Sequence, residues 1–218
     1  MNGKLYVVGT PIGNLSDFSK RAIETLSSVD FIAAEDTRVT QKLLNFFDIK
    51  KPLVSYYEHN RRERGEMIVS RLLNGETCAI VTDAGMPCIS DPGQDLVYLC
   101  HEKGIPVESV PGPTAFATAL AISGMESGRF TFEGFLSTNK PSRKEHLEEL
   151  KNETRTMIFY EAPHKLLKTL NDIYEVFGDR KISLCRELTK LHEEVIRTTL
   201  DGAIALYQEQ APKGEFVL

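Results

Sequence analysis

The residues best suited to chemistry in this sequence follow short apolar runs, at the point where each run stops. Glu35 and Asp36 come directly after the apolar residues 31–34, and Arg38 lies two positions further on. A carboxylate pair beside an arginine can accept a proton, clamp a substrate or form a structural ion pair. The residues by themselves leave these three roles open.

A second run of this kind is CAIVTDAGMPCISDPG, residues 78–93. Its apolar first half predicts a short buried strand. The strand cannot continue, because Pro87 and Pro92 lack a backbone donor and glycines such as Gly85 permit backbone angles that other residues avoid. Taken alone, this segment is a turn capped by Asp83. Several such loops in one place favour a ligand site instead.

Two further loops carry distinctive residues. GTPIGN, residues 9–14, is neither GxGxxG nor a GK[ST] loop, and Pro11 removes one amide from any phosphate cradle. We therefore do not expect phosphate here, and a tight strand-to-helix turn is the alternative. EHNRRER, residues 58–64, contains His59, Asn60, Arg61 and Arg62. It is either a solvated helix start or a patch that grips phosphate groups.

These loops follow a regular alternation of short apolar runs and amphipathic segments. The alternation predicts strands at 4–9, 30–36, 52–57, 78–83 and 106–112, with helices at 19–28, 40–47, 62–75 and 91–104. Such a pattern is typical of a parallel sheet covered by helices. The loops after the five strands would then meet at one edge, where open α/β folds bind ligands.

The second half of the chain has a different pattern. A nearly all-apolar helix at 114–125 is expected to be buried between layers, and further helices are predicted at 142–153, 163–177 and 201–210. Strands are predicted at 129–136, 156–161, 181–188, 193–200 and 214–218, with 181–188 and 193–200 paired antiparallel. We predict a two-domain α/β protein, with a parallel-sheet domain at 1–112 and a mixed-sheet domain at 113–218.

Composition narrows the class of protein. Of the 218 residues, 41% are hydrophobic and 26% are charged, and no apolar run is long enough for a membrane span. The four cysteines show no CxxC spacing, which favours a reduced cytoplasmic protein over a zinc or disulfide framework. The net charge of −5 argues against broad nucleic-acid affinity but allows a local basic patch.

Several motifs, taken in chain order, resemble one known family. They are GTPIGNLSD, AAEDTRVTQKLL, EHN, TDAGMPCISDPG, PGPTA, FEGFL, IFYEAPHKL, RELTKLHEE and KGEF. In this order and spacing they are similar to the ribosomal RNA small subunit methyltransferase I family, of the tetrapyrrole-methylase-like (class III) S-adenosylmethionine methyltransferases. Thr82, Met86, Cys88 and Lys165 are mild departures from the family pattern. Members usually carry an extension after GEF, which this sequence does not include.

The resemblance implies a tetrapyrrole-methylase-like fold that binds S-adenosylmethionine in the cleft between its two domains, in a homodimer. It implies 2′-O-methylation of a cytidine ribose in small-subunit (16S) ribosomal RNA, within the 30S subunit, and no membrane partner. The cofactor-binding residues implied by position are Pro11, Asp83, Ala84, Gly85, Met86, Thr114, Ala115, Ala162 and Leu188.

The chemistry suggests further roles. A ribose 2′-hydroxyl is a poor acid, so a protein group must accept its proton or orient it, and Glu35, Asp36 and Lys190 are the candidates. Arg38, Arg61 and Arg62 are expected to hold RNA phosphates, and His59 and Asn60 belong to the same predicted RNA-binding group.

Two other functions remain open at this stage. The same fold could methylate a tetrapyrrole or a protein side chain, which requires a wide apolar acceptor pocket. The loops could also form a non-catalytic RNA- or nucleotide-binding module. The basic loops EDTR, residues 35–38, and HNRRER, residues 59–64, favour RNA.

Overall fold

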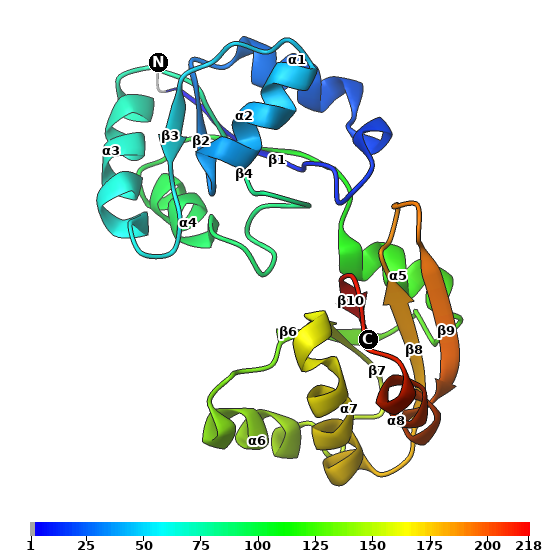
Figure 1. Cartoon of the computed structure of the whole chain (residues 1–218). Coiled ribbons are helices and arrows are strands. Elements are labelled where there is room, and N and C mark those ends of the chain that lie inside the picture. Colours follow the sequence, from blue (N-terminus) through cyan, green and yellow to red (C-terminus); the bar gives the residue numbers. More distant parts are fainter. Residues whose placement is uncertain (1–2) are drawn as a thin grey trace. The chain divides into compact units, whose positions relative to one another are not determined.

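The computed structural model describes residues 3–218. The chain divides into two compact units, of which the first ends at Thr114 and the second runs from Ala115 to Leu218. The predicted boundary after residue 112 lies two residues before this division. Each unit contains one five-stranded sheet with helices packed on it (Figure 1). No helix among the described residues combines the length and apolar composition that a membrane crossing needs.

The first unit is the predicted alternation of strands and helices. Its elements are β1 (Leu5–Val8), η1 (Leu15–Asp17), α1 (Lys20–Ser28), β2 (Phe31–Ala34), α2 (Thr37–Phe46), β3 (Leu53–Ser55), α3 (Arg61–Leu73), β4 (Cys78–Val81), α4 (Gln94–Glu102) and β5 (Val107–Val110). The strand order is β3-β2-β4-β1-β5, and every neighbouring pair is parallel. The predicted parallel sheet is therefore confirmed.

Helices cover both faces of this sheet, which explains why its central strands are apolar throughout. Every residue of β2 and β4 is buried, as expected for parallel strands with two covered faces. One face packs against α1 and α2 through residues such as Leu26 and Leu44. The other packs against α3 and α4 through residues such as Leu72 and Leu96.

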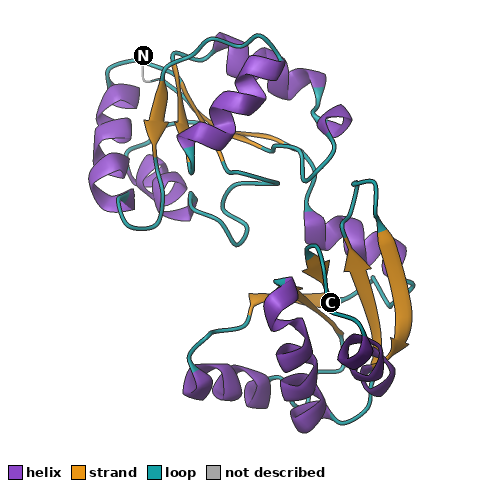
Figure 2. Cartoon of the chain, in the orientation of Figure 1, coloured by secondary structure: helices purple, strands orange, loops and turns teal. Residues whose placement is uncertain are grey.

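The second unit is mixed, as predicted. Its elements are α5 (Ala115–Ser123), β6 (Phe130–Phe135), α6 (Lys140–Glu149), β7 (Thr156–Glu161), α7 (Pro163–Phe177), β8 (Lys181–Arg186), β9 (Glu194–Thr199), α8 (Leu200–Glu209) and β10 (Phe216–Val217). The strand order is β6-β7-β10-β8-β9. Strands β6 and β7 are parallel, and the other neighbours are antiparallel, including the predicted pair β8 and β9. Figure 2 shows the elements by type.

The prediction that the apolar helix α5 is buried between layers is wrong. Only Ala119 and Ser123 of this helix are buried, whereas Ala117, Ala121 and Ile122 are exposed. Helix α5 packs against the sheet strands β7, β8, β9 and β10. Helices α7 and α8 contact each other and the sheet, and α7 also contacts α6. Helix α5 is therefore covered on the side that faces this sheet, and its apolar composition alone could not reveal which residues lie on that side.

Candidate functional site

The candidate site lies in the first unit, at the carboxyl ends of β1 and β4. These two strands are neighbours in the sheet. The chain leaves β1 toward α1 on one face of the sheet and leaves β4 toward α4 on the opposite face. Adjacent strands whose connections diverge in this way form a topological switch point, where open α/β sheets bind ligands.

Backbone hydrogen bonds join the loops at this edge. The amide of Thr10 donates to the carbonyl of Gly85 over 2.9 Å, and the amide of Gly85 donates back to Thr10 over 3.1 Å. The hydroxyl of Thr10 donates to the carbonyl of Thr82 over 3.1 Å. The amide of Gly9 donates to the carbonyl of Val110 over 3.0 Å. The loops after β1, β4 and β5 therefore form one connected surface.

Glycine is required where these loops touch. A Cβ atom on Gly9 would lie 2.7 Å from the Cα of Gly112 and 2.6 Å from the sulfur of Met86. A Cβ atom on Gly112 would in turn lie 2.8 Å from the carbonyl carbon of Gly9. Gly85 has a φ of 88°, in the region that favours glycine. Backbone rather than side chains therefore forms much of this surface.

The predicted cofactor-binding residues of this unit lie along the same loops. Pro11 and Gly85 are buried, Met86 is half-buried, and Asp83 and Ala84 are exposed. The hydroxyl of Thr114 lies 3.4 Å from the carbonyl of Gly112, which it can reach as a weak donor. Ala115 is the first residue of α5.

Three carboxylates lie where β2 and β4 end side by side. The amide of Asp83 donates to Oε2 of Glu35 over 3.4 Å, and the amide of Asp36 donates to Oδ1 of Asp83 over 3.1 Å. The carboxylates of Glu35 and Asp83 thus each bind a backbone amide of the neighbouring loop, whereas the carboxylate of Asp36 binds Arg38. The structure brings the predicted residues Glu35, Asp36 and Asp83 together, although 47 positions separate Asp36 from Asp83 in the sequence.

These carboxylates differ in their affinity for a proton. Burial raises the pKa of Glu35, and the charges of Asp83 and Asp36 add to that rise. Burial also raises the pKa of Asp83. Hydrogen bonds from Arg38 lower the pKa of Asp36 to about 2. Glu35 is therefore the better proton acceptor of the two predicted acidic bases, and Asp36 is held as an anion.

Asp91 is a fourth acidic residue of this group, and it was not selected from the sequence. Burial raises its pKa to about 7, with smaller contributions from the charges of Glu35 and Asp83. Its place in the polar loop 82–93 was visible in the sequence. Its proximity to the β2 loop was not, because that depends on the pairing of β2 with β4. Strongly perturbed carboxylates of this kind cluster at functional sites.

The predicted RNA-binding residues differ in how free they are. Arg38 is paired with Asp36 over 2.6 Å, and Arg61 is paired with Glu58 and Asp95. Exposed Arg62 makes no ion pair with any residue in the described part of the chain. Arg62 is therefore the most available cation of the three.

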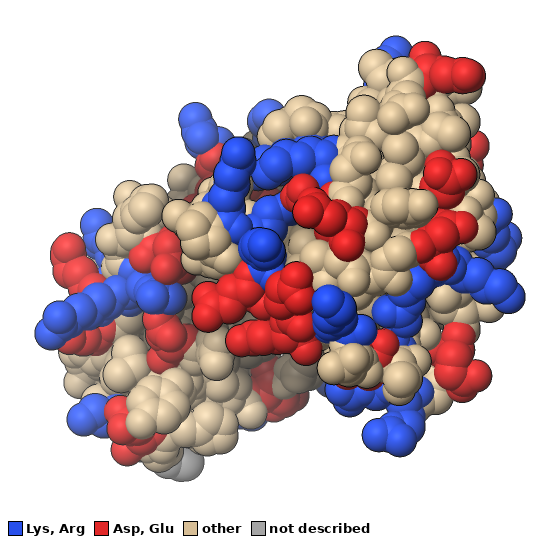
Figure 3. Space-filling model, turned by 90° about the horizontal axis from the view of Figure 1, so that it is seen from below, with Lys and Arg blue, Asp and Glu red and all other residues tan. Residues whose placement is uncertain are grey.

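The other two residues of that loop have local contacts. The Asn60 side chain accepts from the amide of Tyr57 over 2.8 Å and donates to the carbonyl of Ser55 over 3.2 Å. The ring of His59 meets the ring of Tyr57 edge-on. Asn60 therefore shapes the turn before α3. Figure 3 shows one face of the molecule, where basic and acidic side chains are interspersed.

Lys190 of the second unit is held between two carboxylates. Its ammonium group lies 2.8 Å from Oε1 of Glu187 and 2.8 Å from Oε2 of Glu215. Its pKa is raised: burial acts to lower it, but the hydrogen bonds and charges of these two partners outweigh that effect. A protonated lysine cannot accept a proton, so Lys190 fits the role of general base least well of the three candidates.

The other predicted residues of the second unit flank strand ends. Ala162 follows β7 and precedes α7, and it is half-buried. Leu188 follows β8 and is buried. Leu188 lies between Glu187 and Thr189, which both have positive φ angles, 51° and 66°. The chain therefore turns sharply at Leu188.

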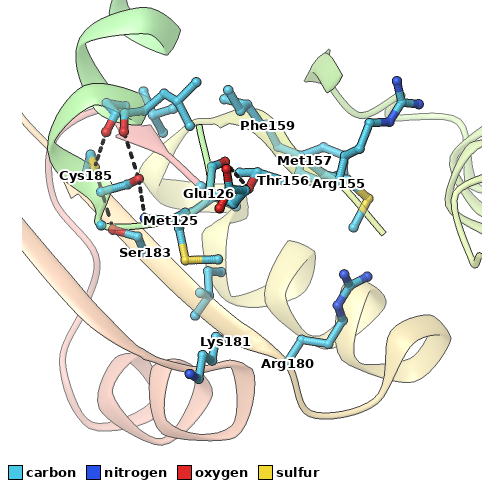
Figure 4. A pocket seen from close by; sticks show the side chains of 18 of the residues that line it. Met125, Glu126, Arg155, Thr156, Met157, Phe159, Arg180, Lys181, Ser183 and Cys185 are labelled. Atoms are coloured by element: carbon cyan, nitrogen blue, oxygen red, sulfur yellow. Dashed lines mark hydrogen bonds between the residues drawn. The ribbon is translucent and has the colours of Figure 1, made fainter. Parts of the chain in front are cut away.

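A separate cavity of about 390 Å³ lies within the second unit (Figure 4). Its walls come from α5 on one face of the sheet, from α7 on the other, and from β7 and β8 between them. Strand β10 lies between β7 and β8 but pairs with each over only two residues. Beyond β10, strands β7 and β8 therefore continue without a strand between them, and both line the cavity. The lining is mainly apolar and includes Met125, Met157 and Phe159. None of the predicted site residues lines it.

The fold and the loops at the switch point define the class of protein. Residues 4–204 match the family described as Tetrapyrrole (Corrin/Porphyrin) Methylases, so the chain belongs to that family. Within it, the most informative relatives carry the name Ribosomal RNA small subunit methyltransferase I.

The similarity to these relatives covers nearly the whole chain. The Synechocystis protein is 52% identical, over 99% of this chain and 78% of its own length. The Thermotoga maritima protein is 50% identical, over 99% of this chain and 97% of its own length. The Bacillus subtilis protein is 50% identical, over 99% of this chain and 74% of its own length.

Solved structures of low sequence identity share the fold. Diphthine synthase superposes with a TM-score of 0.73 at 13% identity, over 99% of this chain and 88% of that one. Uroporphyrin-III C-methyltransferase from Thermus thermophilus has a TM-score of 0.67 at 18% identity, over 99% of this chain and 93% of that one. The same Thermus enzyme has also been solved with S-adenosylhomocysteine, at a TM-score of 0.67 and 16% identity, over 99% of this chain and 96% of that one.

Proposed function

We propose that the protein transfers a methyl group from S-adenosylmethionine to the 2′-hydroxyl of a cytidine ribose in small-subunit ribosomal RNA. The observation that carries this proposal is the 50% to 52% identity, along almost the entire chain, with proteins named for methylation of that RNA. The switch-point loops of the first unit supply a site of the right kind.

The residues at this edge of the sheet fit S-adenosylmethionine. The cofactor carries no phosphate, so the amide missing at Pro11 is no obstacle. The hydroxyl of Thr82 is buried and has no partner among the described residues, so it can bind a ligand group. A Cβ atom on Gly9 or on Gly112 would collide with the backbone of the other residue, so these loops present backbone rather than side chains where they meet. The carboxylates of Glu35 and Asp83 suit a cofactor with positive groups.

We assign the cofactor to the loops after β1, β4 and β5. The residues that would hold it there are Pro11, Asp83, Ala84, Gly85, Met86 and Thr114. Ala115, Ala162 and Leu188 of the second unit stay predictions for cofactor binding. When bound, the cofactor supplies a methyl group on a positively charged sulfur, which is a strong electrophile.

Glu35 is our candidate for the proton acceptor. Its carboxylate is half-buried and its pKa is raised, so it can take the proton of the ribose hydroxyl more readily than Asp36 can. Removal of that proton makes the hydroxyl oxygen a better nucleophile toward carbon. Asp36, held by Arg38, and the protonated Lys190 are then left to orient the substrate rather than to accept a proton.

Arg62 is the candidate with most to offer an RNA phosphate, because its guanidinium is exposed and unpaired among the described residues. Arginine suits phosphate oxygens through its planar set of donors. We further propose that the substrate is the RNA within the 30S subunit, that the protein acts as a homodimer, and that it acts in the cytoplasm, where ribosomal subunits are found.

The test is transfer of label from S-adenosylmethionine with a labelled methyl group. The protein is incubated with 30S subunits that lack ribose methylation, with a tetrapyrrole acceptor and with unfractionated protein in separate reactions. The proposal expects label in small-subunit RNA, in a 2′-O-methylated cytidine that resists alkaline cleavage. Label only in a tetrapyrrole or in protein would refute it, and so would no label anywhere.

Substitution of the candidate base refines this test. Glu35→Gln should lower kcat by at least tenfold, with a smaller change in KM for RNA, because proton transfer in the transition state contributes about 10² or more to rates. Glu63→Gln, on the exposed side of α3, is the matched control and should leave kcat unchanged. An unchanged kcat for Glu35→Gln would exclude Glu35 as the base.

A further inference from the structure

A network of buried polar side chains lies beside Ala162 in the second unit. Glu161, the last residue of β7, is 4% exposed, Thr169 of α7 is 1% exposed and Arg143 of α6 is 5% exposed. These groups come from three different elements. Burying charged groups is costly unless each is paired and hydrogen-bonded, so the contacts within this group determine what it does.

The hydrogen bonds form a single directed chain. Arg143 donates to the hydroxyl oxygen of Thr169 over 2.6 Å. The Thr169 hydroxyl donates to Oε2 of Glu161, and Oε1 of Glu161 accepts from the amide of Ala162 over 2.8 Å. Arg143 also donates to Asp172 over 2.5 Å. Because a guanidinium can only donate, the Thr169 oxygen must accept from Arg143, and its single proton is left to be donated to Glu161.

The end of this chain is the backbone at the turn from β7 to α7. Ala162 is the N-cap residue of α7, and its side chain cannot cap the helix. The Glu161 carboxylate instead binds the Ala162 amide from the preceding strand. Pro163, the first helical residue, has no amide to donate. The backbone position at Ala162 is therefore held on one side by Glu161.

This matters because Ala162 has only a methyl side chain. Any contribution it makes to a ligand depends on where its backbone lies. If this network served only to pack α6 against α7, apolar residues of similar volume could do so without the free-energy cost of burying charges. A buried ionic chain that ends on one amide is better explained by a requirement for a defined backbone position.

We propose that Glu161 is a positioning residue for the cofactor-binding turn at Ala162, and that Thr169 and Arg143 hold its carboxylate in place. This inference rests on the proposed function, since it takes Ala162 to contact S-adenosylmethionine. Glu161 acts through the backbone of Ala162 and takes no part in proton transfer.

The test is binding of S-adenosylmethionine by calorimetry, without RNA, to the full chain. Thr169→Val keeps the shape of the side chain and removes the hydroxyl, so it should raise Kd for the cofactor about tenfold, as expected for the loss of one ordered contact. Thr169→Ser retains the hydroxyl and should restore Kd to within about twofold. Glu161→Gln replaces one of the two acceptor oxygens by an NH2 donor, so the side chain can no longer accept from both Thr169 and Ala162, and Kd should also rise.

A control separates positioning from general loss of stability. Ile173→Val removes one methyl group from the buried face of α7, and Ile173 makes none of the hydrogen bonds of this chain. It should lower the melting temperature and leave Kd unchanged. Amide exchange at Ala162, measured without cofactor, should be faster in Thr169→Val and Glu161→Gln but not in Ile173→Val.

The outcomes are distinct. If Thr169→Val and Glu161→Gln bind the cofactor as the unmodified protein does, the positioning role is wrong and the proposed function stands. If Ile173→Val weakens binding as much as Thr169→Val, the role is structural and the inference fails. If Thr169→Val does not fold, the test is whether Glu161→Gln has a higher Kd for the cofactor than Thr169→Ser, as the positioning role requires. If the unmodified protein does not bind the cofactor, the proposed function fails and this inference with it.

Discussion

Asp91 gives the most quantitative prediction, because burial gives its carboxyl group a higher pKa in the folded protein than in the unfolded chain. Its pKa rises from an ordinary value of 3.8 to about 7 on folding, mainly through burial. Between these two values the folded state binds more protons than the unfolded state, so stability falls as the pH rises. Above pH 7 Asp91 is ionised in both states, and the folded state carries the full free-energy cost of burying its charge.

The size of the effect follows from the shift. A rise from 3.8 to about 7 corresponds to about 4 kcal/mol without screening by solvent. The side chain is only half-buried, so about 2 kcal/mol is expected to remain. Asp91→Asn removes the charge and should raise the free energy of unfolding by that amount at pH 8. At pH 5 only part of this cost is present, because the folded protein keeps the Asp91 carboxyl largely protonated. The increase in the free energy of unfolding for Asp91→Asn should then be under half of its value at pH 8.

Urea unfolding followed by circular dichroism at pH 5 and pH 8 measures both values. A change of about 2 kcal/mol corresponds to a midpoint shift of about 1 M urea. Asp17→Asn, which makes the same substitution at an exposed position of the same unit, is the matched control. Equal gains for Asp91→Asn at the two pH values, or none at pH 8, would refute the argument from burial.

Three further predictions concern the site. Arg62→Gln should flatten the dependence of RNA binding on log salt by about one unit, and Arg61→Gln by less because Arg61 is already paired with acidic neighbours; equal slopes for both variants in filter binding would contradict this. Gly112→Ala should lower the melting temperature and abolish cofactor binding in calorimetry, since its new methyl group would meet the backbone of Gly9 at 2.8 Å; retained binding would show that the loops can shift. Lys190→Met should lower stability without moving the ascending limb of the kcat–pH profile, and a displaced limb would mean that Lys190 sets the protonation of the base.

Much of the first unit could be predicted from residue patterns. Short apolar runs that end in Gly, Pro or acidic residues indicate buried strands followed by shaped loops. Their alternation with amphipathic helices favours a parallel sheet, and a parallel sheet places its loops at one edge. The association of Glu35 with Asp83 follows from this topology once β2 and β4 are known to pair.

The remaining features depend on contacts between distant residues. Lys190 looked like a possible base, yet Glu215, 25 positions away, holds it as a cation. The apolar helix α5 was expected to be buried between layers, yet only Ala119 and Ser123 of this helix are buried. Because nearly all residues of this helix are apolar, its sequence does not mark the side that packs against the sheet.

The order of strands and helices and the positions of the loops could be read from local composition, and the family from motifs in chain order. The raised pKa values of Glu35 and Asp91, the pairing of Arg38 and Arg61, and the hold of Glu161 on the turn at Ala162 became visible only in the folded chain. These features depend on distance and burial, which are set by packing between residues far apart in the chain.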